Sequence, residues 1–158
     1  MSEKPNPILW MVAAGLFLLL LAVAGVKLWP MITPQVVTAL PFNPNCDLQS
    51  GPCVTEMPGG QRVTLSIEPR PIPLVEPLQI QVKLDGVEAE KVFVDIQGLG
   101  MNMGINRPQL ELQEAGRFSG EGMLPVCIRN SMEWEVSVLL ETDEGMISVP
   151  FRFLTDRH

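Results

Sequence analysis

Apolar and polar positions follow two different patterns along this chain. The first is an unbroken run of nineteen uncharged residues from Ile8 to Val26. At about 1.5 Å of rise per residue, a helix reaching from Trp10 to Trp29 spans roughly 28 Å, close to the ~30 Å hydrocarbon core of a bilayer. The two tryptophans then lie at the interfaces, where aromatic residues are favoured. The run predicts a single N-terminal transmembrane helix, an anchor over residues 1–30.

Two other interpretations of the apolar run stay open. Ala22-Val23-Ala24 has the small residues of a signal-peptide cleavage site, and a buried core helix is the second alternative. The retained anchor is favoured for two reasons. The segment before the run carries only Lys4, which Glu3 offsets, and apolar residues continue past the cleavage site to Met31.

The second pattern is an alternation of apolar and polar residues that begins at Arg62. A period of two is typical of β-strands with one buried face. Glycine and Asp-Gly turn signals separate the alternating runs, and no window after Met31 has a sustained helical period. Evenly spaced short strands predict an all-β domain over residues 62–158, an immunoglobulin-like antiparallel β-sandwich. The clearest runs are 62–68, 78–84, 92–96, 110–112, 134–140 and 147–153.

The last two runs predict a hairpin. They are separated by Asp143-Glu144-Gly145, which is a turn sequence. Pro150 falls on the outward face of the final run. Because proline has no N–H to donate, this position predicts an edge strand.

Residues 31–61 predict a proline-rich stalk, since closely spaced prolines favour extended backbone. Within it, six residues separate Cys46 from Cys53, in a loop turned by Gly51 and Pro52. This spacing favours a structural disulfide, and a zinc or redox pair is the alternative. A disulfide persists only in an oxidising compartment. We therefore expect a single-pass protein of the cytoplasmic (inner) membrane with its C-terminal domain in the periplasm.

Charge and composition exclude several functions. From Met31 onward the chain has nine Lys or Arg and seventeen Asp or Glu. Nucleic acids and anionic membrane surfaces both require a basic face, so neither is expected as a partner. The sole histidine is His158 and tyrosine is absent, which leaves little for acid–base chemistry. The chain is not expected to be an enzyme.

Sulfur is the remaining candidate chemistry. Met101 and Met103 stand two apart between Gly100 and Gly104, so in an extended segment both thioethers leave the same face. Cys127 is left without a cysteine partner if a disulfide between Cys46 and Cys53 closes the short loop. Soft sulfur ligands select Cu(I), for which two or three ligands suffice. These residues predict a Cu(I) site formed by Met101, Met103 and Cys127.

Core packing is the competing explanation for each sulfur. Methionine fills irregular cores, and free cysteine is among the most buried residue types. For Cys127 both interpretations stay open. For Met123 and Met132, core packing is the favoured interpretation.

Several short patterns resemble a known family. They are residues 92–96 (Val-Phe-Val-Asp-Ile), 101–103 (Met-Asn-Met), 116–120 (Gly-Arg-Phe-Ser-Gly), 124–127 (Leu-Pro-Val-Cys) and 132–136 (Met-Glu-Trp-Glu-Val). In these the chain resembles membrane-anchored bacterial proteins related to the FixH and YtkA-like domains. The resemblance implies one transmembrane helix, an exported immunoglobulin-like sandwich and a role in copper handling or assembly of respiratory haem-copper oxidases. The family's methionine pattern maps onto Met101 and Met103.

Two functions are therefore expected. The first is a non-catalytic exported domain that binds Cu(I) and assists copper delivery to, or assembly of, a haem-copper oxidase. Its partner would be a membrane protein complex, the oxidase or its assembly factors. The alternative is a metal-free structural accessory subunit of a larger membrane complex.

Overall fold

The computed structural model describes residues 7–32, 36–101, 104–125 and 131–156. The chain divides into two units, residues 1–35 and 36–158, and each is described by itself. The first unit contains helix α1, Pro7–Ile32. Over the part of the chain that the structure describes, no helix combines the length and the apolar character needed to cross a membrane. The predicted transmembrane helix is therefore not confirmed.

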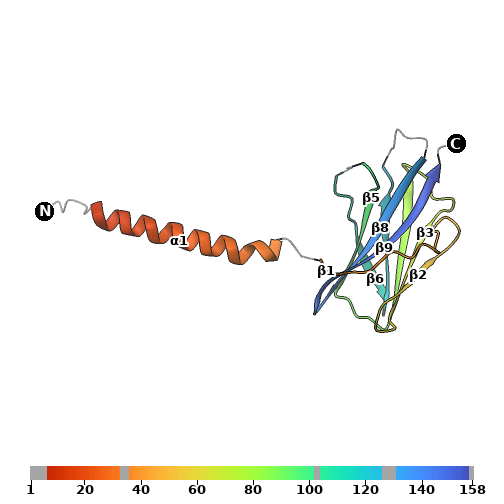
Figure 1. Ribbon diagram of the computed structural model, residues 1–158, viewed down its shortest axis with the longest axis horizontal. Helices are drawn as coiled ribbons and strands as arrows, with labels where there is room; N and C mark the ends of the chain where they lie inside the picture. Colours follow the sequence, from red (N-terminus) through yellow and green to blue (C-terminus); the bar gives the residue numbers. More distant parts are fainter. Residues whose placement is uncertain (1–6, 33–35, 102–103, 126–130, 157–158) are drawn as a thin grey trace. The chain divides into compact units, whose positions relative to one another are not determined.

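The second unit is built from strands, which confirms the all-β prediction for the domain. Its described residues form a nine-stranded sheet in the order β1-β9-β8-β5-β6-β7-β4-β3-β2 (Figure 1). All neighbouring pairs are antiparallel except β1 and β9, which run parallel. The strands are β1 Val36–Ala39, β2 Cys53–Glu56, β3 Arg62–Glu68, β4 Pro77–Asp85, β5 Lys91–Gly98, β6 Gln109–Glu114, β7 Arg117–Met123, β8 Ser131–Thr142 and β9 Gly145–Asp156.

Strand β6 joins the two parts of this sheet. It pairs with β5 at Leu110 and Gln109 and then continues alongside β7, where Glu111 lies opposite Ser119. The sheet is therefore continuous around this corner and curls on itself. This arrangement does not by itself confirm an immunoglobulin-like sandwich of two separate sheets.

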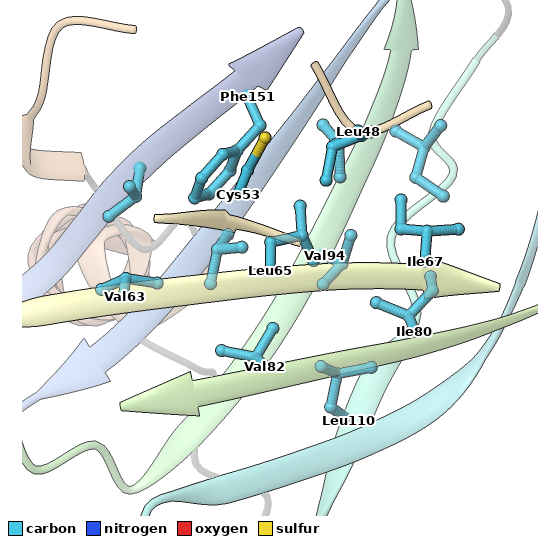
Figure 2. Close-up of a cluster of buried hydrophobic side chains, with 14 of the residues drawn as sticks. Leu48, Cys53, Val63, Leu65, Ile67, Ile80, Val82, Val94, Leu110 and Phe151 are labelled. Carbon is cyan, nitrogen blue, oxygen red and sulfur yellow. The ribbon is translucent and has the colours of Figure 1, made fainter. Parts of the chain in front are cut away.

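One hydrophobic core lies between the two parts of the curled sheet. Figure 2 shows Val63 and Leu65 of β3 and Val82 of β4 facing Val94 of β5 and Phe151 of β9. In β4 the buried positions alternate strictly with exposed ones, as the period of two predicts. The strand sequence alone therefore selects which face packs inward.

Residues 36–61 differ from the predicted stalk, because they belong to the compact domain. They contain β1 and β2, and they place Leu48 and Cys53 fully inside the core. The prolines of this segment lie before or after the strands and leave the strand interiors free to pair. Extended backbone, which proline favours, is also the conformation that a strand requires.

The predicted hairpin is confirmed, but β9 is not an edge strand. Thr142 of β8 lies opposite Gly145 of β9, across the expected turn. Strand β9 lies between β8 and β1, and its described pairs with β1 end at Ser148. Pro150 comes just beyond them, so its missing N–H interrupts no pair with β1 among the described residues.

Candidate functional site

The connection between β5 and β6 carries the predicted methionine pair. Its base is closed by two backbone hydrogen bonds, from Ile96 N to Asn106 O at 2.9 Å and from Val94 N to Pro108 O at 3.0 Å. Met101 N donates to Gly98 O at 3.4 Å, and the Met101 side chain is half-buried against the core. Met103 lies outside the described residues.

The connection between β7 and β8 carries the predicted cysteine ligand. Cys127 itself lies outside the described residues, whereas the start of the connection, residues 124–125, is described. Leu124 is buried, and its carbonyl accepts a hydrogen bond of 2.9 Å from Val75 N. Val75 has a φ of 62°, a conformation that β-branched residues rarely adopt. Such strain persists only where the surrounding contacts impose it.

These two connections leave the sheet at the same end of the domain. The Asn106 Nδ2 donates to Met123 O at 2.9 Å, where β7 ends. Leu99 N donates to Glu133 O at 2.9 Å, where β8 begins. Figure 1 shows the end of β5 and the start of β8 at this same end. The connection with the Met-x-Met pair therefore contacts the end of β7 and the start of β8, the two strands that the connection with Cys127 joins.

Met123 and Met132, the two methionines predicted to pack in the core, differ in burial. Met132 is 3% exposed in β8, which confirms its predicted core position. The same prediction for Met123 is wrong, because that side chain is 46% exposed. Leu124 is buried, and a Cβ at Gly122 would lie 2.6 Å from Ile80 Cδ1. Since neighbouring strand residues point to opposite faces, Met123 points outward.

A groove of about 510 Å³ lies beside Met123. Its apolar residues are Met123, Pro77, Pro108 and Ile105, of which Ile105 is 91% exposed. Carboxylate and amide groups at its border come from Glu121 and Asn106. We call this the Met123 groove.

Arg107 also lines the groove, and an ion pair with Asp95 holds it in place. Arg107 Nη2 lies 3.3 Å from Asp95 Oδ2, and the same oxygen accepts a 2.7 Å hydrogen bond from Gln97 Nε2. Asp95 is buried in β5. These contacts tie the β5–β6 connection to the outer face of β5.

Elsewhere, hydrogen bonding from Lys83 holds the pKa of Asp85 below its usual range.

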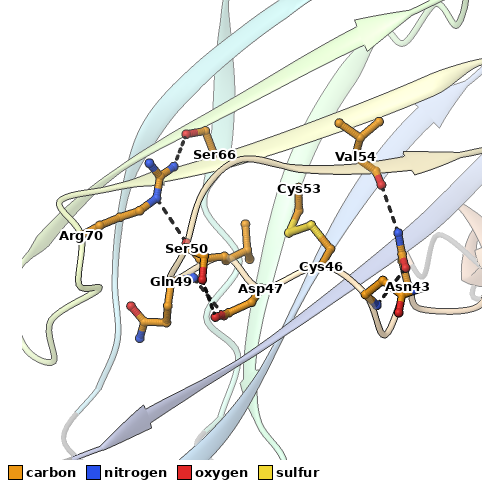
Figure 3. The surroundings of a disulfide bond; sticks show 11 residues. Asn43, Cys46, Asp47, Gln49, Ser50, Cys53, Val54, Ser66 and Arg70 are labelled. Carbon is orange, nitrogen blue, oxygen red and sulfur yellow. Dashed lines mark hydrogen bonds between the residues drawn. A yellow bond between two sulfur atoms is a disulfide. The ribbon is translucent and has the colours of Figure 1, made fainter.

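The predicted disulfide between Cys46 and Cys53 is confirmed (Figure 3). The loop it closes is fixed internally by Asp47, which accepts hydrogen bonds of 3.0 Å from Gln49 N and from Ser50 Oγ. The loop is also attached to the rest of the domain, because Arg70 Nε donates to Leu48 O at 3.2 Å. With Leu48 buried, these contacts indicate a structural role.

Side chains that commonly hold metal ions are not clustered in the described ranges. Among those residues, no group of three or more His, Cys, Asp or Glu lies close enough to hold a metal ion. The predicted Cu(I) site depends on thioethers and on two residues outside these ranges, Met103 and Cys127. It therefore stays a prediction.

Comparison with models of protein families, with curated proteins and with solved structures finds no match for this chain. The resemblance to FixH and YtkA-like domains therefore stays a prediction from the short sequence patterns.

Proposed function

We propose that this protein is a non-catalytic, membrane-anchored domain that binds Cu(I) and assists copper delivery to, or assembly of, a respiratory haem-copper oxidase. The observation that supports a site is that the β5–β6 connection contacts the ends of β7 and β8, the two strands that the second connection joins, through Asn106 with Met123 and Leu99 with Glu133. One connection carries Met101 and Met103, and the other carries Cys127. Two thioethers and a thiolate form a soft, low-coordinate set suited to Cu(I).

The proposal includes a fold and a location. An immunoglobulin-like sandwich is supported by the single core between the two parts of the sheet, which includes Trp134. An anchor in the cytoplasmic membrane is supported by the uncharged run from Ile8 to Val26. A periplasmic domain is supported by the disulfide, which an oxidising compartment preserves.

A metal-free accessory subunit is the second candidate function. It is favoured by one observation, the half-buried Met101 side chain that packs against the core. A methionine that only fills space would be placed in this way. Copper binding separates the two functions.

The copper site is tested with the full chain and the variant Met101→Leu/Met103→Leu. We expect one Cu(I) per wild-type chain and none in the variant, measured by competition with a chromophoric Cu(I) chelator. Leucine conserves volume, so the variant should lose less than about 1.5 kcal/mol of unfolding free energy for each substitution. Thiolate ligation releases a proton, so affinity should rise with pH in the wild type and less so in Cys127→Ser.

The control for this experiment is Met132→Leu, which changes a buried methionine and should leave copper binding intact. A wild-type chain that competes no better than the double variant would establish the metal-free subunit instead.

The anchor is tested by intact-mass spectrometry of the protein extracted from the membrane fraction. We expect the recovered chain to retain residues 8–26, because the run is long enough to span the hydrocarbon core. Carbonate extraction should leave the chain in the membrane. A mature chain that begins near Gly25 would replace the anchor with a cleaved signal peptide.

A further inference from the structure

We infer that the Cys46–Cys53 disulfide is a redox-sensitive latch that keeps strand β2 closed against the segment 40–50. The latch belongs to the β-domain itself and does not involve copper. Three features point to it: the way in which β2 is held, a buried hydroxyl without a partner within β2, and the unequal exposure of the two cysteines.

Strand β2 is held by pairing on one side and mainly by the disulfide on the other. It ends the order of the described sheet and pairs there with β3 alone, over four residues. On its other side, the polar and covalent contacts with the described segment 40–50 are the disulfide and a hydrogen bond of 3.5 Å from Asn43 Nδ2 to Val54 O (Figure 3). A hydrogen bond of this length is weak. The cross-link is therefore the main tie between β2 and this segment.

The segment 40–50 is also attached to β9, near the other end of the sheet order. Leu40 N donates to Ser148 O of β9 at 2.9 Å, and Gln49 Nε2 donates to Leu154 O of the same strand at 3.0 Å. The segment thus reaches from β9 to β2. The disulfide closes the seam between these two strands on the β2 side.

Thr55 makes the closed position of β2 energetically costly. Its side chain is buried, and its Oγ1 has no hydrogen-bond partner within the described ranges. A buried hydroxyl without a partner has lost its hydrogen bonds to water, so it disfavours the closed state. Opening of the seam admits water to this hydroxyl. The disulfide therefore opposes a local opening that Thr55 favours.

A dithiol reductant releases the latch. Cys46 is half-buried whereas Cys53 is fully buried, so the Cys46 sulfur is the one open to attack. A thiolate of the reductant bonds to Cys46 Sγ, the disulfide bond breaks, and its electron pair and a proton go to Cys53 Sγ. The second thiol of the reductant then displaces Cys46, which takes the second proton. The dithiol leaves as a disulfide, and the protein keeps two thiols.

The test follows amide hydrogen exchange of the full chain without added copper, oxidised and held reduced by excess dithiothreitol. The Met57 amide, which donates to Gln61 O at 2.8 Å, reports on the end of β2. We expect the amides of residues 53–57 to exchange at least about tenfold faster after reduction, because β2 opens locally. The Leu84 amide, which donates to Gly116 O, is the control, and its exchange should rise far less. Alkylation and intact-mass measurement confirm that both cysteines of the latch are reduced.

Two variants of Thr55 test the source of the opening. Thr55→Val replaces the hydroxyl by a methyl group, so in the reduced protein it should slow exchange at residues 53–57 about fivefold or more. Thr55→Ser keeps the hydroxyl and should not slow this exchange. Protection of the Leu84 amide shows in each variant that the domain is folded.

Three results would overturn the latch. Reduced wild-type protein could exchange at residues 53–57 at the oxidised rate, which would mean that the disulfide does not keep β2 closed. An equal rise at Leu84 would mean that reduction only destabilises the whole domain. Equal exchange in Thr55→Val and Thr55→Ser would remove the hydroxyl as the cause of opening. None of these results involves Cu(I), so each leaves the proposed function standing.

Discussion

Replacing Trp134 with alanine is expected to lower the free energy of unfolding by about 3 to 5 kcal/mol, the cost of removing a large aromatic side chain from a packed core. Trp134 is fully buried in β8, and its Nε1 donates to the buried Thr155 Oγ1 of β9 at 2.9 Å. The substitution removes the ring's contacts and also the hydroxyl's indole partner. Urea unfolding of the full chain measures the loss.

Two variants separate the causes of this loss. Thr155→Val removes the hydroxyl and leaves the indole N–H unpaired, at a cost of about 1 to 3 kcal/mol. Trp10→Ala changes a tryptophan that is exposed in α1 and should leave unfolding of the β-domain unchanged. A Trp134→Ala protein that unfolds at the wild-type urea concentration would contradict the packing of this core.

The predicted strands are correct where burial alternates with a period of two. Leu78, Ile80, Val82 and Leu84 in β4 are all buried, as their spacing indicates. A physical reason explains why strand β7 was not among the clearest runs of alternating apolar and polar residues. A Cβ at Gly120 would lie 2.8 Å from Leu110 Cδ2 and 3.4 Å from Gln109 O, so β6 approaches closely at an inward position where β7 carries glycine in place of an apolar side chain.

The role of residues 36–61 could not be predicted in the same way. Proline spacing describes local backbone preference, whereas the burial of Leu48 depends on partners far along the chain, including Arg70. The disulfide was predictable because both cysteines belong to one short loop. The exposure of Met123 could not be predicted from the sequence, because it depends on which face of β7 packs against Ile80.

Removing the disulfide is the second large effect we expect. Cys46→Ala/Cys53→Ala should lower the free energy of unfolding by about 2 to 4 kcal/mol, since the cross-link restricts the unfolded chain. The loss should extend beyond the loop, because Gln49 joins two other segments. Its Oε1 accepts from Ile72 N at 2.7 Å, and its Nε2 donates to Leu154 O at 3.0 Å. Chemical denaturation of the variant and of the wild type measures the difference.

Reduction of the wild-type chain with dithiothreitol should reproduce this loss, and it should have no further effect on the double variant. Hydrogen exchange locates the change. The Ile72 amide should exchange faster in the variant because the Gln49 side chain that accepts its hydrogen bond is less firmly held. The Leu84 amide, which donates to Gly116 O at 2.7 Å, is the matched control and should keep its relative protection. Unchanged protection at Ile72 would mean that Leu48 and Arg70 hold the loop in place without the cross-link.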